Sequence, residues 1–437
     1  MSLGALDTAA VARALALVAS RPDDLADAYF ERLTEEELPP PGARVGLRVR
    51  REGGLAVRLV RGERSWLASR DALDGETLAD ALRAVARTVP PAFPEPDEAA
   101  EQPAEPPSAL GELAGFTGLL ERELRRRLVA FPLRVTARRH RREIRVVTPR
   151  TASALESESF ASVDVETPWG RCGALAAELD AAAAAALAER LLVRFRGRDA
   201  PSPAAGHPPL LLAPGATAVA LHECVAHALE ADLLARSGNP AAADGTELGT
   251  SELDVLDDPS SAPSGVARAA DDEGTPICRR WLLRRGRVAQ PIADRRAARR
   301  WPELVPGSGF RAGRHAPPLP RSHHLELLSG AADAARLAAL AEGGLAVPDV
   351  ASGALDPATG EFWLEIPGAR RIRGGELAET VGRFVVRGRL AQLLSGVVAV
   401  GIERETAGAG WCAKAGQRRA VWATAPAIVV AGLEVST

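Results

Sequence analysis

The sequence predicts an α+β protein in which an N-terminal α/β region is followed by a larger β-rich C-terminal domain around one short helix. Apolar residues recur at helical spacing mainly in the first half of the chain, whereas short apolar runs between Gly and Pro turns dominate after residue 257. With 437 residues and 46% hydrophobic content, the chain can bury at least two cores. We therefore expect more than one domain.

A proline-rich stretch divides the N-terminal region. Residues 89–108 are almost wholly Pro, Glu and Ala, a composition that cannot bury apolar surface, so we expect a loose, exposed linker there. The predicted organisation is an N-terminal α/β domain (1–88), this linker, a central α/β domain (109–200) and a C-terminal β-rich domain (201–437).

The N-terminal elements follow from hydrophobic spacing. Helices are expected as two short segments within 5–34 and as single segments near 75–88, 109–129 and 174–193. Strands are expected at 44–50, 55–60, 131–137, 143–148 and 160–166.

The C-terminal half is predicted to begin with a buried strand at 209–213, which leads through a turn containing Gly215 into the short helix. A strand, a turn and a helix in this order place side chains on a rigid scaffold. The later strands are expected to wrap around this helix, at 278–288, 344–350, 361–366, 382–387, 396–403 and 420–435.

Charge and the chain's N-terminal pattern narrow the functional class. The net charge of −3 argues against a nucleic-acid partner. Arginine clusters at 125–127 and 138–142 alternate with apolar positions, so we interpret them as solvated faces of a helix and a strand. The first helical pattern contains Asp7 and Arg13, unlike a signal peptide, and no apolar run approaches the ~20 residues that span a bilayer.

Cysteine usage points to a reducing compartment. The four cysteines lie far apart and lack a disulfide-like spacing: Cys172, Cys224, Cys278 and Cys412. We therefore expect a cytoplasmic protein with no membrane partner.

The most informative motif is the histidine pair in Leu-His-Glu-Cys-Val-Ala-His-Ala-Leu-Glu. His222 and His227 flank Glu223 in an apolar segment of a chain with only seven histidines. Hydrolysis on a zinc ion needs neutral nitrogen ligands and a carboxylate that takes a proton from the attacking water. The motif therefore indicates a metal-dependent hydrolase.

The spacing of the two histidines is unusual. At i and i+5, a regular helix separates the imidazoles of His222 and His227 by roughly 140° around its axis. One metal can reach both only if the helix is underwound, as in a π-bulge, or if one histidine lies at the helix end. A second interpretation stays open, because Glu223, His227 and Glu230 form a regular helical stripe that suits a buried network without metal.

This segment resembles the active-site helix of the TldD/PmbA family, once called modulators of DNA gyrase, whose signature is His-Glu-x-x-x-His followed by Leu-Glu-x-Asp. Other motifs of the family have counterparts in the same order: a first hairpin at Gly54–Arg58 and Trp66–Ser69, an Asp-Asp-Glu-Gly turn at Asp271–Thr275, and a Cys-Gly-Lys-x-Gly-Gln segment at Gly410–Gln417. The likeness runs through most of the chain.

The resemblance implies a metallopeptidase site in the C-terminal domain. Zinc would be held by His222, His227 and Cys412, which leaves a fourth position for water. Glu223 would act as general base, and Lys414 would stabilise the oxyanion. The resemblance also implies that Cys412 lies on a loop between two strands, close to the histidines.

The family's substrates are peptides and unstructured polypeptides, often leader sequences of modified peptides. An extended substrate of this kind suggests pairing with an exposed strand edge. The resemblance further implies a homodimer or a heterodimer with a TldD/PmbA-type paralogue.

The composition of the chain favours a specific role for Lys414. It is the single lysine among 54 basic residues, all the others being arginine. A lysine that remains in such a chain suggests a position that needs a compact ammonium, although it can also have survived by chance. Glu230 or Asp232 would orient a ligand histidine through its second ring nitrogen, unless both are plain helix-surface carboxylates.

The chain departs from the family pattern at several positions. Ala226 and Ala413 stand where the family usually has glycine, and Pro-Arg-Ser-His-His replaces Pro-Arg-x-Thr-Asn. We expect Arg321, His323 and His324 to shape the substrate cleft. Adjacent histidines in a strand point to opposite faces, so at most one can join a metal site, and we expect a solvent-exposed pair.

Three functions of different classes remain open at this stage. The first is the metallopeptidase, and the second is a catalytically silent subunit, against which the intact set of candidate ligands argues. The third is a regulatory binding protein with a structural metal. A fourth protein ligand such as His323 would favour the third, because structural zinc sites are closed.

Overall fold

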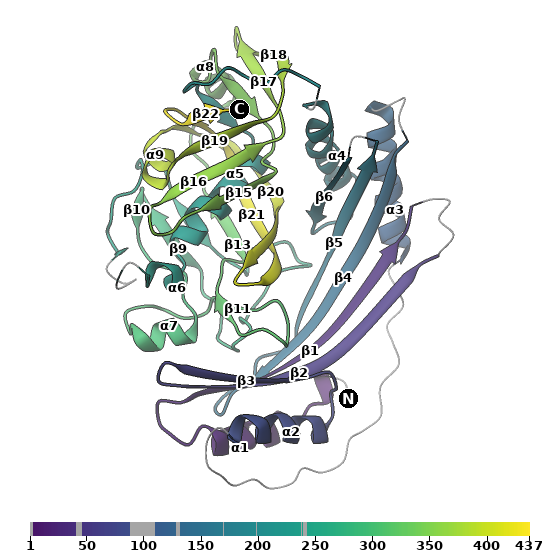
Figure 1. Cartoon of the computed structure of the whole chain (residues 1–437), viewed down its shortest axis with the longest axis vertical. Helices are drawn as coiled ribbons and strands as arrows, with labels where there is room; N and C mark the ends of the chain where they lie inside the picture. Colours follow the sequence, from purple (N-terminus) through teal and green to yellow (C-terminus); the bar gives the residue numbers. More distant parts are fainter. Residues whose placement is uncertain are drawn as a thin grey trace.

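The computed structural model describes residues 3–40, 46–87, 110–127, 132–168, 170–197, 199–236, 238 and 243–437. The predicted linker, residues 89–108, lies outside the described residues. The chain forms an N-terminal half built on one sheet and a strand-rich C-terminal half (Figure 1). The predicted α+β class is confirmed.

A six-stranded antiparallel sheet in the order β3-β2-β1-β4-β5-β6 forms the N-terminal half. Its strands are β1 (Leu25–Leu38), β2 (Arg48–Arg61), β3 (Arg64–Arg70), β4 (Arg134–Val147), β5 (Glu156–Thr167) and β6 (Gly170–Ala176). Because β1 pairs with β4, strands from before and after residues 89–108 share one sheet.

Four helices cover the two ends of this sheet: α1 (Thr8–Val18), α2 (Gly75–Ala86), α3 (Leu110–Arg127) and α4 (Ala181–Arg196). The first two pack on β1–β3, and the other two pack together against β4–β6 (Figure 1). Asp7, Asp74 and Asp180 accept hydrogen bonds from backbone N–H groups at the starts of α1, α2 and α4. These caps explain where the three helices begin.

The N-terminal predictions need several corrections. Residues 25–38 form β1 rather than a second helix, because the segment pairs with strands on both sides and buries both faces, Ala28 and Phe30 on one and Tyr29 on the other. Single strands, β4 and β2, take the place of the strand pairs predicted at 131–137 and 143–148 and at 44–50 and 55–60, and residues 174–176, predicted as the start of a helix, belong to β6.

The arginine clusters differ from each other. Arg125 and Arg126 are exposed on α3, as predicted. Arg142 is buried, however, where it forms ion pairs with Glu31 at 3.2 Å and Glu158 at 3.6 Å, so the prediction of a fully solvated strand face is wrong. An arginine that meets carboxylates can be buried where an unpaired one cannot.

Two sheets enclose the helix of the C-terminal half. The larger has the order β10-β9-β8-β13-β21-β7-β14-β17-β18, with β20 paired to β21, and the smaller has the order β15-β16-β19-β22. The larger contains β7 (Leu210–Leu212), β8 (Val255–Asp257), β9 (Arg280–Arg284), β10 (Arg287–Val288), β13 (His324–Leu327), β14 (Leu345–Val347), β17 (Ala369–Arg373), β18 (Glu376–Val381), β20 (Val397–Lys414) and β21 (Gln417–Val430). The smaller contains β15 (Ser352–Leu355), β16 (Glu361–Ile366), β19 (Phe384–Arg389) and β22 (Glu434–Ser436).

The enclosed helix begins as α5 (Pro214–Ala220) and continues as a π-helical segment, η2 (Leu221–Ala226). The largest hydrophobic core surrounds both, with side chains from β7, β13, β16, β19 and β21. Shorter elements complete this half: α6 (Ala231–Leu234), α7 (Arg295–Arg300), α8 (Ala334–Leu340), α9 (Leu390–Ser395), β11 (Gly309–Phe310) and β12 (Leu319–Pro320). No described helix is both long enough and apolar enough to cross a membrane.

The hairpin of β20 and β21 ends in a tight turn. Lys414 lies opposite Gln417, and the two residues between them, Ala415 and Gly416, have positive φ angles of 49° and 76°. This is the pattern of a two-residue hairpin turn. Because backbone pairing continues to Lys414, Cys412 lies within β20, and the prediction that it lies on a loop is wrong.

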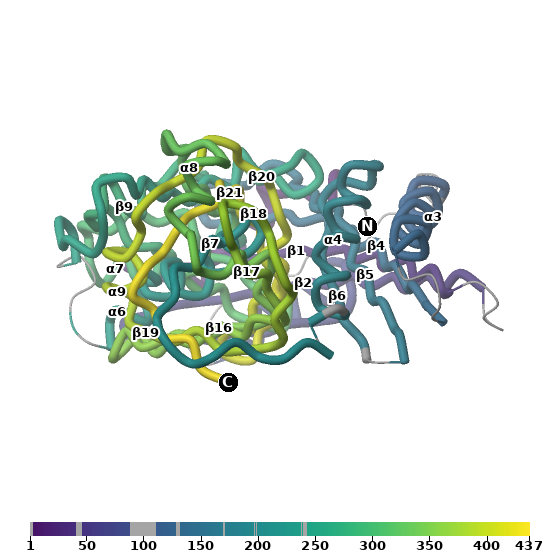
Figure 2. Tube along the Cα trace, turned by 90° about the horizontal axis from the view of Figure 1, so that it is seen from above, coloured from purple at the N-terminus to yellow at the C-terminus, as the bar shows by residue number. Residues whose placement is uncertain are grey.

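The two halves lie side by side, with α4 between α3 and the C-terminal half (Figure 2). Buried ion pairs join them. Arg58 of β2 lies 2.5 Å from both Asp27 of β1 and Glu273 of the turn that follows residue 270, and all three side chains are at most 2% exposed. The guanidinium of Arg311 lies 3.1 Å from Asp27, and the backbone N–H of Arg311 donates to Oδ2 of Asp272 at 2.9 Å. Buried ion pairs at the Asp-Asp-Glu-Gly turn thus connect the C-terminal half to the N-terminal sheet.

Candidate metal centre

The π-helical segment η2 brings the two histidines of the motif together. The backbone N–H of His227 donates to the carbonyl of His222, an i to i+5 hydrogen bond that defines π geometry. As a result the two imidazole centroids lie 4.8 Å apart. The chain therefore has the underwound helix that this spacing requires for one metal to reach both rings.

Cys412 of β20 completes the group. One ligand atom each from His222, His227 and Cys412 lies within 4.8 Å of the others, and the Sγ of Cys412 is 3.4 Å from Nε2 of His227. The Nε2 atom of His222 is buried and has no hydrogen-bond partner among the described residues. Two imidazole nitrogens and one sulfur facing a common point are a donor set that fits Zn²⁺.

The local electrostatics favour a thiolate at this point. Burial alone would raise the pKa of the Cys412 thiol, but the imidazoles of His222 and His227 outweigh it and lower that pKa to about 4. Burial also lowers the pKa of His227, and the carboxylate of Glu230 reverses this effect and raises it. Charge is therefore concentrated on the sulfur and on the carboxylate behind His227.

Glu223 lies on η2 between the two histidines. Its side chain is half-buried, and burial raises the pKa of its carboxyl group. No hydrogen bond or ion pair of this carboxylate is present among the described residues, so it is available to exchange a proton. Its Cγ lies beside β15, where a Cβ added to Gly353 would be 3.3 Å away.

Glu230 supports His227 from behind. The Nδ1–H of His227 donates to Oε2 of Glu230 at 2.9 Å, and this contact leaves Nε2 free to act as a ligand. Lys414 donates to the same oxygen at 2.9 Å and to Asp232 at 2.7 Å. The contact expected between a second-sphere carboxylate and a ligand histidine is present for Glu230, whereas Asp232 contacts the lysine.

Lys414 occupies a different place from the one predicted. Its three N–H donors are used by Glu230, Asp232 and the carbonyl of Pro320, the last at 2.7 Å. The side chain is 8% exposed. The ammonium therefore has no donor left for an oxyanion, and we correct its expected role from oxyanion stabilisation to support of Glu230.

Residues 321–324 also need correction. His323 and His324 are buried, not exposed as predicted, because Nε2 of His323 bonds to the carbonyl of Val266 and Nε2 of His324 to the hydroxyl of Thr424. Arg321 is buried as well, and its guanidinium lies 3.1 Å from the Sγ of Cys412. None of the three therefore presents an exposed side chain to a cleft.

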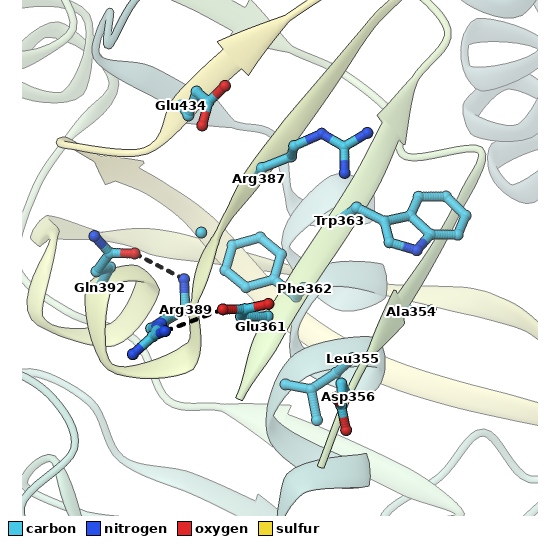
Figure 3. A pocket seen from close by; sticks show the side chains of 11 residues that line it. Ala354, Leu355, Asp356, Glu361, Phe362, Trp363, Arg387, Arg389, Gln392 and Glu434 are labelled. Carbon is cyan, nitrogen blue, oxygen red and sulfur yellow. Dashed lines mark hydrogen bonds and ion pairs between the residues drawn. The ribbon is translucent and has the colours of Figure 1, made fainter. Parts of the chain in front are cut away.

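A shallow depression lies on the outer face of the small sheet (Figure 3). Ala354, Trp363, Arg387 and Glu434 form a row across its four strands, with Trp363 half-exposed. The residues of the metal set do not line it. Ala354 follows Gly353 in β15, so the edge strand β15 separates this depression from Glu223.

The model of the PmbA/TldA metallopeptidase C-terminal domain matches residues 205–437, more than half of the chain. This chain belongs to the TldD/PmbA family. The match includes every residue of the metal set as well as Glu223 and Lys414.

Curated relatives agree with this assignment. A metalloprotease TldD homolog from Buchnera aphidicola is 24% identical over 230 residues, which are 52% of this chain and 47% of that protein. Another from Haemophilus influenzae is 27% identical over 228 residues, with the same coverage of 52% and 47%. The chain spans about half the length of the curated relatives it matches. Since these relatives are named metalloproteases, this TldD/PmbA member belongs to a metallopeptidase family.

The likeness of fold extends over the whole chain. The crystal structure of TldE from Thermococcus kodakarensis superposes with a TM-score of 0.72 at 17% identity, covering 98% of this chain and 100% of that one. The N-terminal sheet, which lies outside the matched C-terminal domain, is therefore also part of the TldD/PmbA fold.

Sequence reasoning missed two contacts of this site. The hydroxyl of Ser322 lies 3.3 Å from Nδ1 of His222, a contact that no motif predicts. Arg321, predicted to shape a cleft, contacts the Sγ of Cys412 instead. The available signal was the Pro-Arg pair that matches the family's Pro-Arg-x-Thr-Asn segment, but its target cannot be read from the sequence.

Proposed function

We propose that this TldD/PmbA protein is a zinc-dependent peptidase that hydrolyses peptides or unstructured polypeptides. The observation that carries the proposal is the convergence of His222, His227 and Cys412 around one point beside the uncommitted carboxylate of Glu223. Three protein ligands are typical of catalytic zinc sites, which keep an open position. The described residues offer no fourth ligand to this group, which weighs against a closed structural site.

Each residue then has a defined task. Zinc at this site supplies Lewis acidity that polarises the scissile carbonyl and makes water nucleophilic near neutral pH. Glu223 takes the proton from the attacking water at a carboxylate oxygen and returns it to the leaving amine, a role that a raised pKa favours. Glu230 accepts from Nδ1–H of His227, which leaves Nε2, 3.4 Å from the Sγ of Cys412, as the atom that would bind zinc.

The substrate would bind as an extended strand along β15. This strand ends the order of the small sheet and lies next to η2. The backbone N–H of Asp356, just after β15, donates to the carbonyl of Glu361 in β16. Because hydrogen-bonded pairs alternate with non-bonded pairs along antiparallel strands, the backbone groups of Gly353 and Leu355 point away from β16 to the open edge. A peptide paired there would lie along Glu223, and main-chain pairing suits substrates without fixed structure.

We further propose that the protein acts in the cytoplasm as a homodimer or as a heterodimer with a TldD/PmbA-type paralogue. The fold shared with TldE supports a subunit of this kind. The four cysteines are free, as expected in a reducing compartment. A non-catalytic or regulatory subunit with a structural metal is the alternative.

Metal analysis combined with Glu223→Gln separates these proposals. We expect the purified protein to contain one zinc per chain and to cleave a disordered test peptide, alone or with a paralogue. The Glu223→Gln variant should keep its zinc and lose cleavage. Cleavage unchanged in this variant would remove Glu223 from the mechanism, and zinc without any cleavage, alone or with the paralogue, would favour the regulatory alternative.

A further inference from the structure

Arg321 contacts the sulfur of the metal set directly. Its Nη2 donates to Sγ of Cys412 at 3.1 Å and to the carbonyl of the same residue at 2.9 Å. Weaker contacts of 3.4 Å join both terminal nitrogens to the carbonyl of Gln417. Arg321 is 1% exposed, so the guanidinium is fixed against β20 and the turn that follows it.

The charge of Arg321 calls for a negative partner, because an isolated ion is costly to bury. Within the described ranges, no carboxylate forms an ion pair with this guanidinium. The group it does contact is the sulfur of Cys412, and a cysteine binds zinc as a thiolate. The buried cation and the ligand sulfur are therefore each other's direct polar partners.

The neighbours of Arg321 support the other two ligands. The carbonyl of Pro320 accepts a hydrogen bond from Lys414, the residue that holds Glu230 against His227. The hydroxyl of Ser322 lies 3.3 Å from Nδ1 of His222.

Of the three successive residues Pro320–Ser322, Arg321 and Ser322 contact Cys412 and His222 directly, and Pro320 is connected to His227 through Lys414 and Glu230. A single extended segment fixes how the ligands stand relative to one another.

We propose that Arg321 is a positioning residue that orients the Cys412 thiolate and limits how much charge it gives to the metal. The inference rests on the proposed zinc site. An N–H···S hydrogen bond draws electron density from the sulfur, and such bonds are known to tune metal–thiolate centres. A thiolate that donates less leaves the metal a stronger Lewis acid, so Arg321 offsets the cost of having sulfur rather than a third nitrogen in a hydrolytic site.

Cobalt(II) substitution tests this role through a readout other than activity. Metal-free wild-type protein, Arg321→Met and Arg321→Lys are titrated with Co²⁺, and the near-ultraviolet thiolate-to-cobalt charge-transfer band and the dissociation constant are measured. We expect Arg321→Met to move the band to longer wavelength, because the sulfur lone pair loses its hydrogen bond, and to weaken metal binding about 10- to 100-fold. Arg321→Lys, which keeps a cation, should show smaller changes in both.

Arg280→Met is the matched control. Arg280 is also 1% exposed and donates to the carbonyls of Pro291 and Pro306, without contact to the metal set. Its removal should leave the cobalt band in place, so a change seen only in the Arg321 variants reports on the sulfur rather than on loss of a buried guanidinium. Far-ultraviolet circular dichroism checks the fold of each variant.

The outcomes separate this inference from the proposed function. An unchanged band and an unchanged affinity in folded Arg321→Met would overturn the role of Arg321 while leaving the zinc site intact. If Arg321→Met does not fold, Arg321→Lys decides by the same two readouts. Wild-type protein that shows no thiolate-to-cobalt band at all would instead refute the metal site on which both proposals depend.

Discussion

Replacing Lys414 with methionine should destabilise the protein markedly even without metal. The substitution keeps the length of the side chain but removes the cation beside Glu230, a carboxylate with no exposed surface. Burial raises the pKa of Glu230, but His227 and Lys414 outweigh it and lower this pKa from 4.5 to about 2. His227 contributes to this shift before Lys414 does, so we take the expected loss from the lower end of the range for breaking one side of a buried ion pair, about 3 kcal/mol.

The pH dependence of this contribution has a definite sign. Because the folded pKa of Glu230 lies below the unfolded one, its stabilisation is complete above about pH 4.5 and is lost as the pH falls toward about 2. In Lys414→Met we therefore expect the free energy of unfolding at pH 7 to drop by about 3 kcal/mol, with a smaller difference from wild type at pH 3. Denaturant unfolding in the presence of a chelator measures both values, since bound metal would add its own stabilisation.

Arg389→Met is the control for this experiment. Its ion pair with Glu361 has a similar length, 3.0 Å, but both side chains are more than half exposed, so its loss should cost at most about 1 kcal/mol. A loss in Lys414→Met no larger than in Arg389→Met would refute the reasoning that Glu230 depends on the lysine. Lys414→Arg should restore only part of the stability, because a planar guanidinium does not replace three divergent donors.

Three further predictions test other parts of the chain. Burial and the charge of Glu273 raise the pKa of Asp294 to about 7, so the free energy of unfolding of the wild type should fall as the pH rises from about 4 to 7. In Asp294→Asn, which keeps a capping side chain, denaturant titrations should show a smaller fall over the same pH range. An equal fall in both proteins would contradict the raised pKa of Asp294. Ala415→Gly should raise the melting temperature through a gain of about 1 kcal/mol, because φ of 49° strains any residue with a Cβ. Gly353→Ala places a Cβ 2.6 Å from Leu364 and 3.3 Å from Glu223, so peptide cleavage should fall while zinc content stays the same; loss of zinc instead would show that the substitution disturbs the ligands.

The sequence predicts the local geometry around His222 and His227 better than several of the N-terminal elements. Helix periodicity alone shows that one metal can reach His222 and His227 only if the helix is underwound or one histidine lies at its end, and η2 is the underwound case. By contrast, residues 25–34 contain helix-forming residues and fall within the stretch predicted as two short helices. Their conformation as β1 is decided by pairing with β2 and β4, which local propensity does not encode.

The contacts of the side chains around the candidate ligands are harder to predict from the sequence than the candidate ligands. Composition draws attention to Lys414, but its partners come from two segments distant in sequence, 230–232 and Pro320, so the direction of its side chain is not predictable from the sequence. His323 and His324 look polar and exposed in a proline-rich context. They are buried because backbone carbonyls and hydroxyls of neighbouring segments satisfy their ring nitrogens.

The buried ion pairs between the Asp271–Gly274 turn and the N-terminal sheet limit how this protein can be divided into separate fragments. Residues 205–437 hold all the candidate ligands, yet Glu273 in that stretch forms its ion pair with Arg58 of the N-terminal sheet, and Asp272 has Arg142 of that sheet at 3.8 Å in addition to Arg268 of its own half at 3.0 Å. Cut away from that sheet, the C-terminal portion would have to rehydrate or protonate acids that are wholly enclosed in the intact chain. The C-terminal half is therefore not expected to fold unchanged without the N-terminal sheet, and isolating it would require redesign of the Asp271–Gly274 turn as well.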